Sequence, residues 1–579
     1  MGFFSPAEPP FAYEEWRRLP HLERIKPLAQ DWAVNGFGTP YFVYLLYVVK
    51  LVVYALGGLL LISATSGGVG GIGDLGSWWT QPIVFEKAVV WTMLWEALGL
   101  GAGSLPLTLR FSPMIGGVLY WLRPGTTRMP PWPDRVPLTR GTRRTWFDVA
   151  LYAGLIAAAL NLLLSDVTRL DPVAVGVLLA ILVALGLRDK VPFLAARAEV
   201  YGNLMIVFLF PLTNLVIAAQ LVFVCIWWGA ASSKLNRHFP FVVTVMISNT
   251  PWNRSRRFKR ELYRDHPEDL LPSRLGEADA HLGTLIEFTL PLILLATSGG
   301  LLGTIAVAGM VIFHLHILST FPLAVPLEWN VFMIFGVLFL FGHYGDVPWS
   351  TLEDPLLLAI LALTCVCIPV LGNFRPDLIS FLPSMRYYAG NWATSQWLFR
   401  RDTHAEGKLD ESIVKAAPIV TRQLQKFYDD ELIDVLIYKG LAFRSMHSHG
   451  RALNALAGRA VEDLEAYDVR EGELVSGVVL GYNFGDGHFH NEKLLAAVQE
   501  RCRFAPGEVR VVTLESQPAH STKQRYRIFD AATGLLEEGT VDVRDMVVRQ
   551  PWLGGEPFPV EPLPAAPAAA PEVPAAPAV

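Results

Sequence analysis

The 579-residue chain is 52% apolar and only 17% charged, against about 25% charged residues in an average soluble domain. Its 48 Lys and Arg residues against 53 Asp and Glu give a formal charge of −5, which favours neither nucleic acid nor a strongly charged partner. Long apolar runs separated by charged blocks exclude an ordinary soluble enzyme, a disordered chain and a coiled coil. The pattern predicts a polytopic α-helical membrane protein with a small soluble α+β domain.

Residues 1–40 precede the first apolar run and mix charged residues with tryptophans. They lack the ordered basic start, apolar middle and small-residue cleavage site of a secretory signal. We therefore expect an interfacial, partly helical segment with Trp16 and Trp32 at the depth of the lipid headgroups.

Residues 41–375 are predicted to form the transmembrane domain. A helix needs about 20 apolar residues to cross roughly 30 Å of hydrocarbon, and the runs in this region predict about nine or ten spans. The pair of runs around Gly299 and Gly300 forms either a broken helix or two passes. The candidate spans are 41–64, 83–103, 148–165, 172–187, 202–231, 284–298, 301–320, 331–344 and 355–371.

Arginine placement predicts the orientation in the cell membrane. Loop 104–147 carries seven arginines against one acid, Asp134, so the positive-inside rule makes this loop, the N-terminus and the C-terminal domain cytoplasmic. A second basic block, 253–264, falls outside if 202–231 is a single pass. A short tilted or re-entrant piece at 239–248 would return this block to the cytoplasm, and we favour that arrangement.

The chain changes character after the last apolar run, where we expect a linker at 376–404. Residues 405–550 are predicted to form a small α+β domain that binds a protein partner. The predicted strands are 474–480, 508–515 and 524–530, with a hairpin loop at 530–534; the predicted helices are 411–439, 451–467 and 492–502, the last capped by Asn491. Residues 551–579 form a Pro/Ala-rich tail that is too poor in core residues to fold.

Lys234 is the most informative ionisable residue near an apolar run. It follows the longest run in W-W-G-A-A-S-S-K-L-N, where Trp227 and Trp228 are candidate cofactor-binding side chains. Desolvation favours the uncharged amine, which would make Lys234 a general base, and the same effect would make Glu287 a proton donor. In the alternative, Lys234 only anchors a helix end among the lipid headgroups.

His314 and His316 lie within the run F-H-L-H and are further catalytic candidates. Side chains two residues apart on a helix differ in direction by about 200°, so both cannot face one metal ion. We expect one hydrogen-bonded or proton-handling histidine in the bundle interior.

The segment around Lys234 resembles a known family. W-W-G-A-A-S-S-K-L-N is similar to the aromatic, small-residue, K-L segment in the transmembrane part of vitamin K-dependent gamma-carboxylase and its bacterial relatives, and residues 313–321 resemble another segment of that family. The resemblance implies that Lys234 deprotonates a reduced quinone. We find no counterpart of the carboxylase's large lumenal domain, so only the lysine-centred site carries over.

The whole chain has a second resemblance. With its S-P-M-I-G-G-V-L-Y-W-L-R-P-G-T loop from Ser112 and its C-terminal α+β domain, it is similar to an uncharacterised actinobacterial family of multi-span membrane proteins.

A second candidate site lies in the α+β domain. In an extended stretch, residues two apart share a face, so Asp486, His488 and His490 could converge on a metal ion. The alternative is an ordinary loop of polar residues and glycines that caps the following helix.

Three functions remain open, and the sequence identifies no cofactor. The first is an integral membrane enzyme that uses Lys234 on a lipid-soluble substrate, either quinone-like or polyprenyl-like. The second is a component of lipid transport or cell-envelope assembly. The third is a scaffold whose polar residues only join helices. Membrane lipids are expected partners in each case, and nucleic acid is not.

Overall fold

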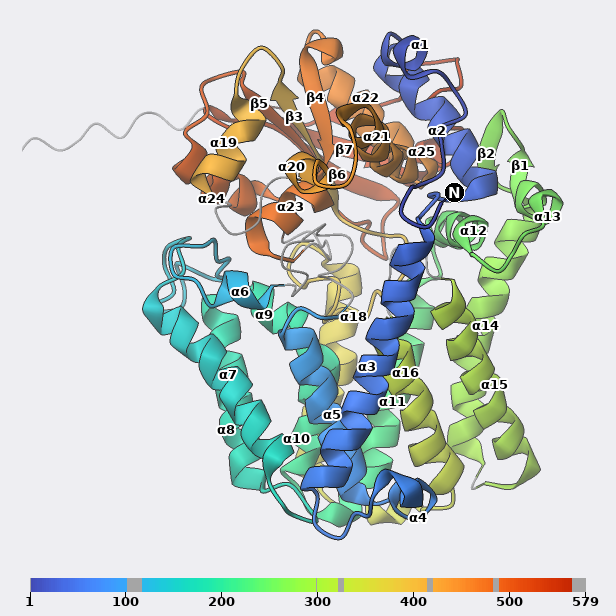
Figure 1. The fold of residues 1–579 in the computed structure, drawn as a ribbon, viewed down its shortest axis with the longest axis vertical. Helices are drawn as coiled ribbons and strands as arrows, with labels where there is room; N and C mark the ends of the chain where they lie inside the picture. Colours follow the sequence, from blue (N-terminus) through green and yellow to red (C-terminus); the bar gives the residue numbers. More distant parts are fainter. Residues whose placement is uncertain are drawn as a thin grey trace, which may run out of the picture.

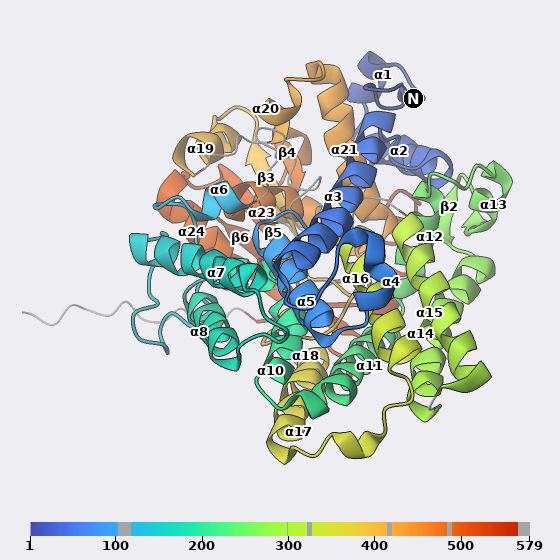
Figure 2. The same ribbon diagram turned by 60° about the horizontal axis from the view of Figure 1, so that its bottom comes forward.

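The computed structural model describes residues 2–101, 117–297, 299–320, 327–413, 420–482 and 489–564. A bundle of helices occupies one end of the molecule, and an α+β domain covers the other end (Figure 1). We call the end of the bundle next to this domain the α+β end, and the opposite one the far end. Helices α7 and α8 lie at one side of the bundle, and α14 and α15 lie at the other (Figure 2).

The described part of the chain contains six helical stretches long and apolar enough to cross a membrane. This confirms the helical membrane domain, whereas the count of nine or ten spans stays a prediction. The six are α3 (Tyr41–Thr65), α7 (Trp146–Leu164), Leu212–Ser233 with α11 (Leu215–Ser233), α14 (Arg274–Ala296), α15 (Gly300–Ser319), and Pro355–Phe374 with α17 (Pro355–Leu361) and α18 (Ile368–Phe374).

Shorter helices complete the bundle. Helix α5 (Pro82–Ala97) is almost entirely buried, so it is an inner helix of the bundle. The others are α4 (Leu75–Trp78), α6 (Val118–Trp121), α8 (Pro172–Arg188), α9 (Lys190–Ala195), α10 (Asn203–Phe208) after a π-helical turn, α12 (Phe239–Asn249), α13 (Arg256–Glu261), and α16 (Leu327–Gly336) with its π-helical continuation Val337–His343.

The sequence predicted one helix for the long apolar run 202–231, but the structure has two helices there. Helix α10 ends at Phe208, and α11 begins at Leu215. Pro211 lies in the break, where it removes a backbone donor and disfavours helical geometry in the preceding residue. Because α10 and α11 pack against each other, the chain turns back at this point.

This reversal resolves the predicted conflict between the two basic blocks. Helix α6 lies within the first block and α13 within the second, and both helices lie at the α+β end (Figure 1). Helix α4, which begins at the end of the glycine-rich stretch 66–76, lies at the far end (Figure 1). Both blocks therefore share one side of the bundle, but the reversal between α10 and α11 brings this about, and not the piece at 239–248 that we favoured from the sequence, which forms α12.

Lys87 joins the ends of two helices inside the bundle. Its fully buried ammonium donates to the carbonyl oxygens of Thr65, Leu163 and Ser165 at 2.7–2.9 Å, and to the Thr65 hydroxyl at 2.9 Å. The last carbonyls of a helix have no partner within the helix. The single amine of Lys87 therefore satisfies the C-terminal ends of both α3 and α7.

We expect Lys87→Met to lower the free energy of unfolding by about 1–3 kcal/mol, because the Thr65 and Ser165 carbonyl groups lose the donor that Lys87 supplies. Thermal denaturation in detergent measures this loss. The control is Lys26→Met, whose half-exposed ion pair with Glu268 should contribute only about 0–1 kcal/mol. Equal melting temperatures for the two variants would contradict the role of Lys87.

The α+β domain is built on an antiparallel sheet with strand order β4-β3-β5-β6-β7-β8. Strand β5 (Val509–Leu514), strand β6 (Lys523–Asp530) and the turn to β7 (Gly534–Asp542) agree with the predicted strands and hairpin. The other strands are β3 (Thr394–Arg400), β4 (Tyr467–Glu471) and β8 (Glu561–Pro562), and a separate pair, β1 (Tyr263–Asp265) and β2 (Asp269–Pro272), precedes α14.

The helices of this domain agree only partly with the predictions. Helix α24 (Glu492–Cys502) begins after Asn491, whose side chain accepts from Lys493 N as predicted. The predicted strand 474–480 is wrong: these residues belong to α23 (Gly472–Leu480), because a short apolar run fits a buried helix as well as a strand. The remaining helices are α19 (Ala405–Ser412), α20 (Val420–Leu424), α21 (Asp430–Met446), α22 (Gly450–Ala460) and α25 (Val543–Met546).

The domain extends beyond its predicted boundaries. Strand β3 lies within the predicted linker 376–404, and it pairs with β4 on one side and β5 on the other. Residues 551–564 of the predicted disordered tail are also folded, because Trp552 is buried and β8 pairs with β7. Residues 565–579 of that tail lie outside the described residues.

The N-terminal segment packs on protein rather than among lipid headgroups. It contains α1 (Tyr13–Arg17) and α2 (His21–Asn35), and α2 lies against α21 (Figure 1). Trp16 and Trp32 are each 1% exposed, and their rings contact Tyr438 and Phe443 at centroid distances of 5.1 Å. The predicted interfacial position of these tryptophans is therefore wrong, because their apolar face is covered by α21.

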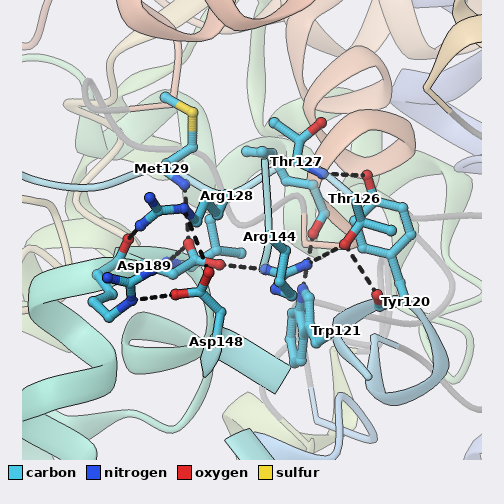
Figure 3. A network of polar contacts seen from close by, with 12 residues as sticks. Tyr120, Trp121, Thr126, Thr127, Arg128, Met129, Arg144, Asp148 and Asp189 are labelled. Atoms are coloured by element: carbon cyan, nitrogen blue, oxygen red, sulfur yellow. Dashed lines mark hydrogen bonds and ion pairs between the residues drawn. The ribbon is translucent and has the colours of Figure 1, made fainter. Parts of the chain in front are cut away.

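A buried network of ion pairs fixes the loop that precedes α7 (Figure 3). Arg144 pairs with Asp189, and Arg188 pairs with Asp148. Arg128 donates to the carbonyl oxygen of Arg188 at 2.9 Å and lies 3.6 Å from Asp148. Asp189 also accepts from the backbone of Met129 and caps α9 through Val191 N.

The same loop attaches the α+β domain to the bundle. The Tyr120 hydroxyl donates to the carbonyl oxygen of Val479, and the Trp121 indole donates to that of Leu480 at 2.9 Å. From the other side, Arg501 donates to the carbonyl oxygen of Gly125 at 2.9 Å. The ion-pair network therefore supports a direct contact between the two parts of the protein.

Candidate functional site

A cavity of about 540 Å³ lies inside the bundle. Its walls come from α11, α12, α14, α15 and α16, and from residues 387–388, which follow α18. Most of the lining side chains are apolar or aromatic, and a few polar groups converge among them. A concave apolar site with a small number of placed polar groups is typical of small-molecule binding.

Lys234 and Glu287 form a buried ion pair on the wall of this cavity. Lys234 follows α11, Glu287 lies on α14, and Lys234 Nζ is 2.5 Å from Glu287 Oε2. The two residues are 6% and 4% exposed, and Lys234 Nζ also lies 5.3 Å above the centre of the Phe239 ring. The amine is therefore enclosed by protein, as the catalytic hypothesis requires.

His314 lies on the same cavity, with both ring nitrogens hydrogen-bonded. The Trp227 indole donates to His314 Nε2 at 3.1 Å, and His314 Nδ1 lies 2.8 Å from Asn330 Oδ1. An indole N–H only donates, so Nε2 accepts and the ring proton sits on Nδ1. His314 is thereby held as a neutral imidazole of fixed orientation, which suits a wall of the site better than a proton carrier.

The other candidate site residues of the bundle differ in their position relative to the cavity. Trp227 lines the cavity, whereas the Trp228 indole donates to the carbonyl oxygen of Phe288 at 3.2 Å and the side chain is not among those that line it. His316 is exposed at the edge of the cavity, and Asp279 of α14 also lies at this edge. Trp227 and His314 therefore share a wall, and His316 stands apart from them.

A second polar group at the cavity went unnoticed in the sequence. Arg197 lines the cavity and pairs with Glu199 at 2.7 Å, and its guanidinium lies 4.4 Å from the centre of the Trp329 ring. Tyr387 donates to Glu199 at 3.1 Å. Glu96 lines the same region. The available signal was an arginine close to the start of the predicted span 202–231, whereas Tyr387 fell in the predicted linker.

The predicted metal site cannot be assembled from the described residues. Asp486 and His488 lie outside them, and His490 Nδ1 is hydrogen-bonded to the Ser395 hydroxyl at 2.9 Å. Over the described ranges, no three His, Cys, Asp or Glu side chains are placed to hold a metal ion. The metal hypothesis for Asp486, His488 and His490 therefore stays a prediction.

Three buried histidines lie where α12 meets the α+β domain. The rings of His238 and His449 are stacked, with centroids 4.9 Å apart and an angle of 10° between planes. His238 Nδ1 is 2.6 Å from the Ser448 hydroxyl, and His447 Nδ1 is 2.6 Å from the carbonyl oxygen of Phe443. Burial lowers the pKa of His238 to about 4, and burial with the nearby Arg444 charge lowers the pKa of His447 to about 3.

These histidines predict a loss of stability in acid. The unfolded chain binds a proton on His447 below its ordinary pKa of about 6.5, whereas the folded protein does so only near pH 3. Stability therefore falls from pH 6.5 downward, and His447 alone accounts for about 2 kcal/mol at pH 5. Thermal melting from pH 7.5 to 5 should show a smaller drop for His447→Phe than for the wild type. The exposed His404→Gln should leave the drop unchanged.

Comparison with known proteins gives one family. The model of a family described as "Transmembrane protein of unknown function (DUF3556)" matches residues 1–563, which bears out a multi-span membrane family. No curated protein and no solved structure matches the chain, and the carboxylase resemblance stays a prediction. Since the match extends over nearly the entire sequence, the chain belongs to this DUF3556 family of transmembrane proteins.

Proposed function

We propose that the protein is an integral membrane enzyme that moves a proton on a lipid-soluble substrate held beside Lys234. One observation carries this proposal: a Lys–Glu pair with a 2.5 Å contact opens onto a largely apolar cavity of about 540 Å³ within the bundle. An ionisable pair in this setting costs solvation energy, so it is retained mainly where it serves binding or proton transfer.

Lys234 would be the base in this reaction. Transfer of the shared proton from Nζ to Glu287 Oε2 leaves an uncharged amine and a carboxylic acid. The amine can then accept a proton from an acidic hydroxyl of the substrate, which leaves an ammonium beside a substrate oxyanion. Glu287 keeps the transferred proton until it gives that proton to the oxygen or carbon that carries the negative charge. Trp227 and His314, fixed by their mutual hydrogen bond, would hold the substrate ring or chain against the pair.

The chemistry of the cavity suits a quinone-like or polyprenyl-like substrate. Most of its described lining side chains are apolar, and the Lys and Arg side chains among them, Lys234 and Arg197, already pair with carboxylates. We further propose that the bundle resides in the cell membrane with its α+β end in the cytoplasm, because both basic blocks lie at that end.

The test is Lys234→Arg. Arginine keeps a positive charge opposite Glu287, so the bundle should fold, but a guanidinium is not deprotonated in proteins. In cells that carry this variant, we expect the function of the protein to be lost although the membrane contains the normal amount of it. The lipid extract of the purified variant, examined by mass spectrometry, should still contain the molecule that co-purifies with the wild type. Normal function of Lys234→Arg would exclude Lys234 as a base.

Lipid transport or envelope assembly is the second candidate. It is favoured by the exposed cavity-lining residue His316 at the edge of α15, since a transporter needs an open path. Substrate flux across vesicles containing Lys234→Arg would identify transport, because flux without chemistry does not need a base.

A further inference from the structure

In the described part of the chain, the exposed residues of the cavity wall are confined to two helices. Among the described lining residues, Leu282 is 54% exposed and Ile312 is 67% exposed, and His316 is exposed as well. Leu282 lies on α14, and the other two lie on α15. The remaining described lining residues are buried or half-buried, so the opening lies between these two helices.

The surface around this opening is one that would face lipid. Helices α14 and α15 are both of membrane-spanning length and composition, and they form one side of the bundle (Figure 2). Two large apolar side chains exposed on such helices are expected in hydrocarbon and costly in water. The cavity therefore opens sideways toward the bilayer.

We propose that a lipid-phase molecule with one long apolar chain and an uncharged polar end enters the cavity through a lateral window between α14 and α15. This inference rests on the proposed function in one respect, the assignment of Lys234 and Glu287 as the reactive pair. The window belongs to the leaflet at the α+β end, because α14 starts and α15 ends there (Figure 1).

Depth along α14 supports an uncharged polar end. Asp279 and His316 form the polar edge of the window, near the exposed Trp252, whose indole donates to Ser319 at 3.0 Å. Glu287 lies eight residues beyond Asp279, which corresponds to about 12 Å along a helix. A phosphate group would have to leave the headgroup layer to reach the pair at that depth, whereas a hydroxyl or a ring carbonyl can do so at far lower cost.

Gly283 forms part of the window. A Cβ at Gly283 would meet no atom within 4 Å, whereas one at Gly309, further along the same helix pair, would lie 2.7 Å from Leu290 Cδ1. The two helices are thus in contact at Gly309 and leave open space at Gly283. A Cβ at position 283 therefore displaces no neighbour, and we expect a large side chain there to extend into this space and close the window.

The experiment uses the full chain in vesicles of phosphatidylethanolamine and phosphatidylglycerol that contain a diazirine derivative of geranylgeraniol. After irradiation, mass spectrometry compares labelling of the peptide that holds the buried Met333, a lining residue, with labelling of α7. We expect the wild type to be labelled at both places, and Gly283→Trp and the smaller Gly283→Leu to lose label only at Met333.

Gly154→Trp is the matched control, because Gly154 lies on α7, where an added Cβ meets Ile181 only at an ordinary 3.9 Å. It should keep both labels. Persistent labelling of Met333 in both Gly283 variants, or no labelling of Met333 in the wild type, would overturn the window. Lys234→Arg should keep the Met333 label, so failure of the base leaves this result unaffected and the two proposals are tested separately.

Discussion

Lys234→Met is expected to lower the free energy of unfolding by about 3–5 kcal/mol, because it leaves the Glu287 carboxylate buried without its partner. Glu287 is 4% exposed and contacts the lysine amine at 2.5 Å, so water cannot replace the lost charge. Thermal denaturation in detergent, followed by near-ultraviolet circular dichroism, measures the loss. The double variant Lys234→Met/Glu287→Leu should regain most of the stability, since replacing both members of a buried pair is often neutral or stabilising.

The double variant separates stability from function. We expect it to fold and to remain inactive, whereas a scaffold in which the pair only joins helices would regain function with stability. Arg257→Met is the control, because its pair with Glu261 is largely exposed and is worth about 0–1 kcal/mol. If Lys234→Met and Arg257→Met have the same melting temperature, the Lys234–Glu287 pair is not desolvated and the proposed site is wrong.

Asp189→Ala should cost about 3–5 kcal/mol as well, since it leaves the Arg144 guanidinium buried and unpaired. The carboxylate is fully buried and also accepts from Met129 N and Val191 N, so three donors lose their acceptor at once. Because the loop of Tyr120 contacts the α+β domain, hydrogen exchange should rise in residues 120–145 and in α23.

The matched control for Asp189 is Asp134→Ala in the same loop. Asp134 pairs with Arg140, and both side chains are at least 80% exposed, so the variant should change stability by only about 0–1 kcal/mol. Unchanged hydrogen exchange in Asp189→Ala would show that the loop is held by its other contacts and that the ion-pair network is dispensable for domain contact.

The sequence identified the centre of the candidate site because charge inside an apolar run is costly wherever the chain folds. Glu287, His314 and His316 stood out because they lie inside apolar runs, and Lys234 because it follows the longest one; all four line one cavity. Their mutual arrangement was not predictable, since it depends on how α11, α14 and α15 pack. The Asn330 contact that fixes His314 is a single amide in an apolar run, and nothing local links it to a histidine on another helix.

The elements that escaped prediction lack the periodic pattern on which prediction depends. Strand β3 is buried on both faces from Thr394 to Phe399, so it shows no alternation of apolar and polar residues. The two tryptophans of the N-terminal segment are equally compatible with headgroups and with a protein partner. Only the position of α21, about 400 residues later in the chain, decides between these two environments.

Strand β3 also constrains how the protein can be made and dissected. Its two neighbours in the sheet, β4 and β5, begin at Tyr467 and Val509. Because β3 ends at Arg400, its second neighbour becomes available only after more than a hundred further residues have been synthesised. The interval is longer still for helix α2, because α21, which it contacts, must be synthesised first. A recombinant fragment limited to residues 405–550 would therefore lack a central strand and a covering helix, and the smallest version expected to stay monomeric joins residues 13–35 to 394–564.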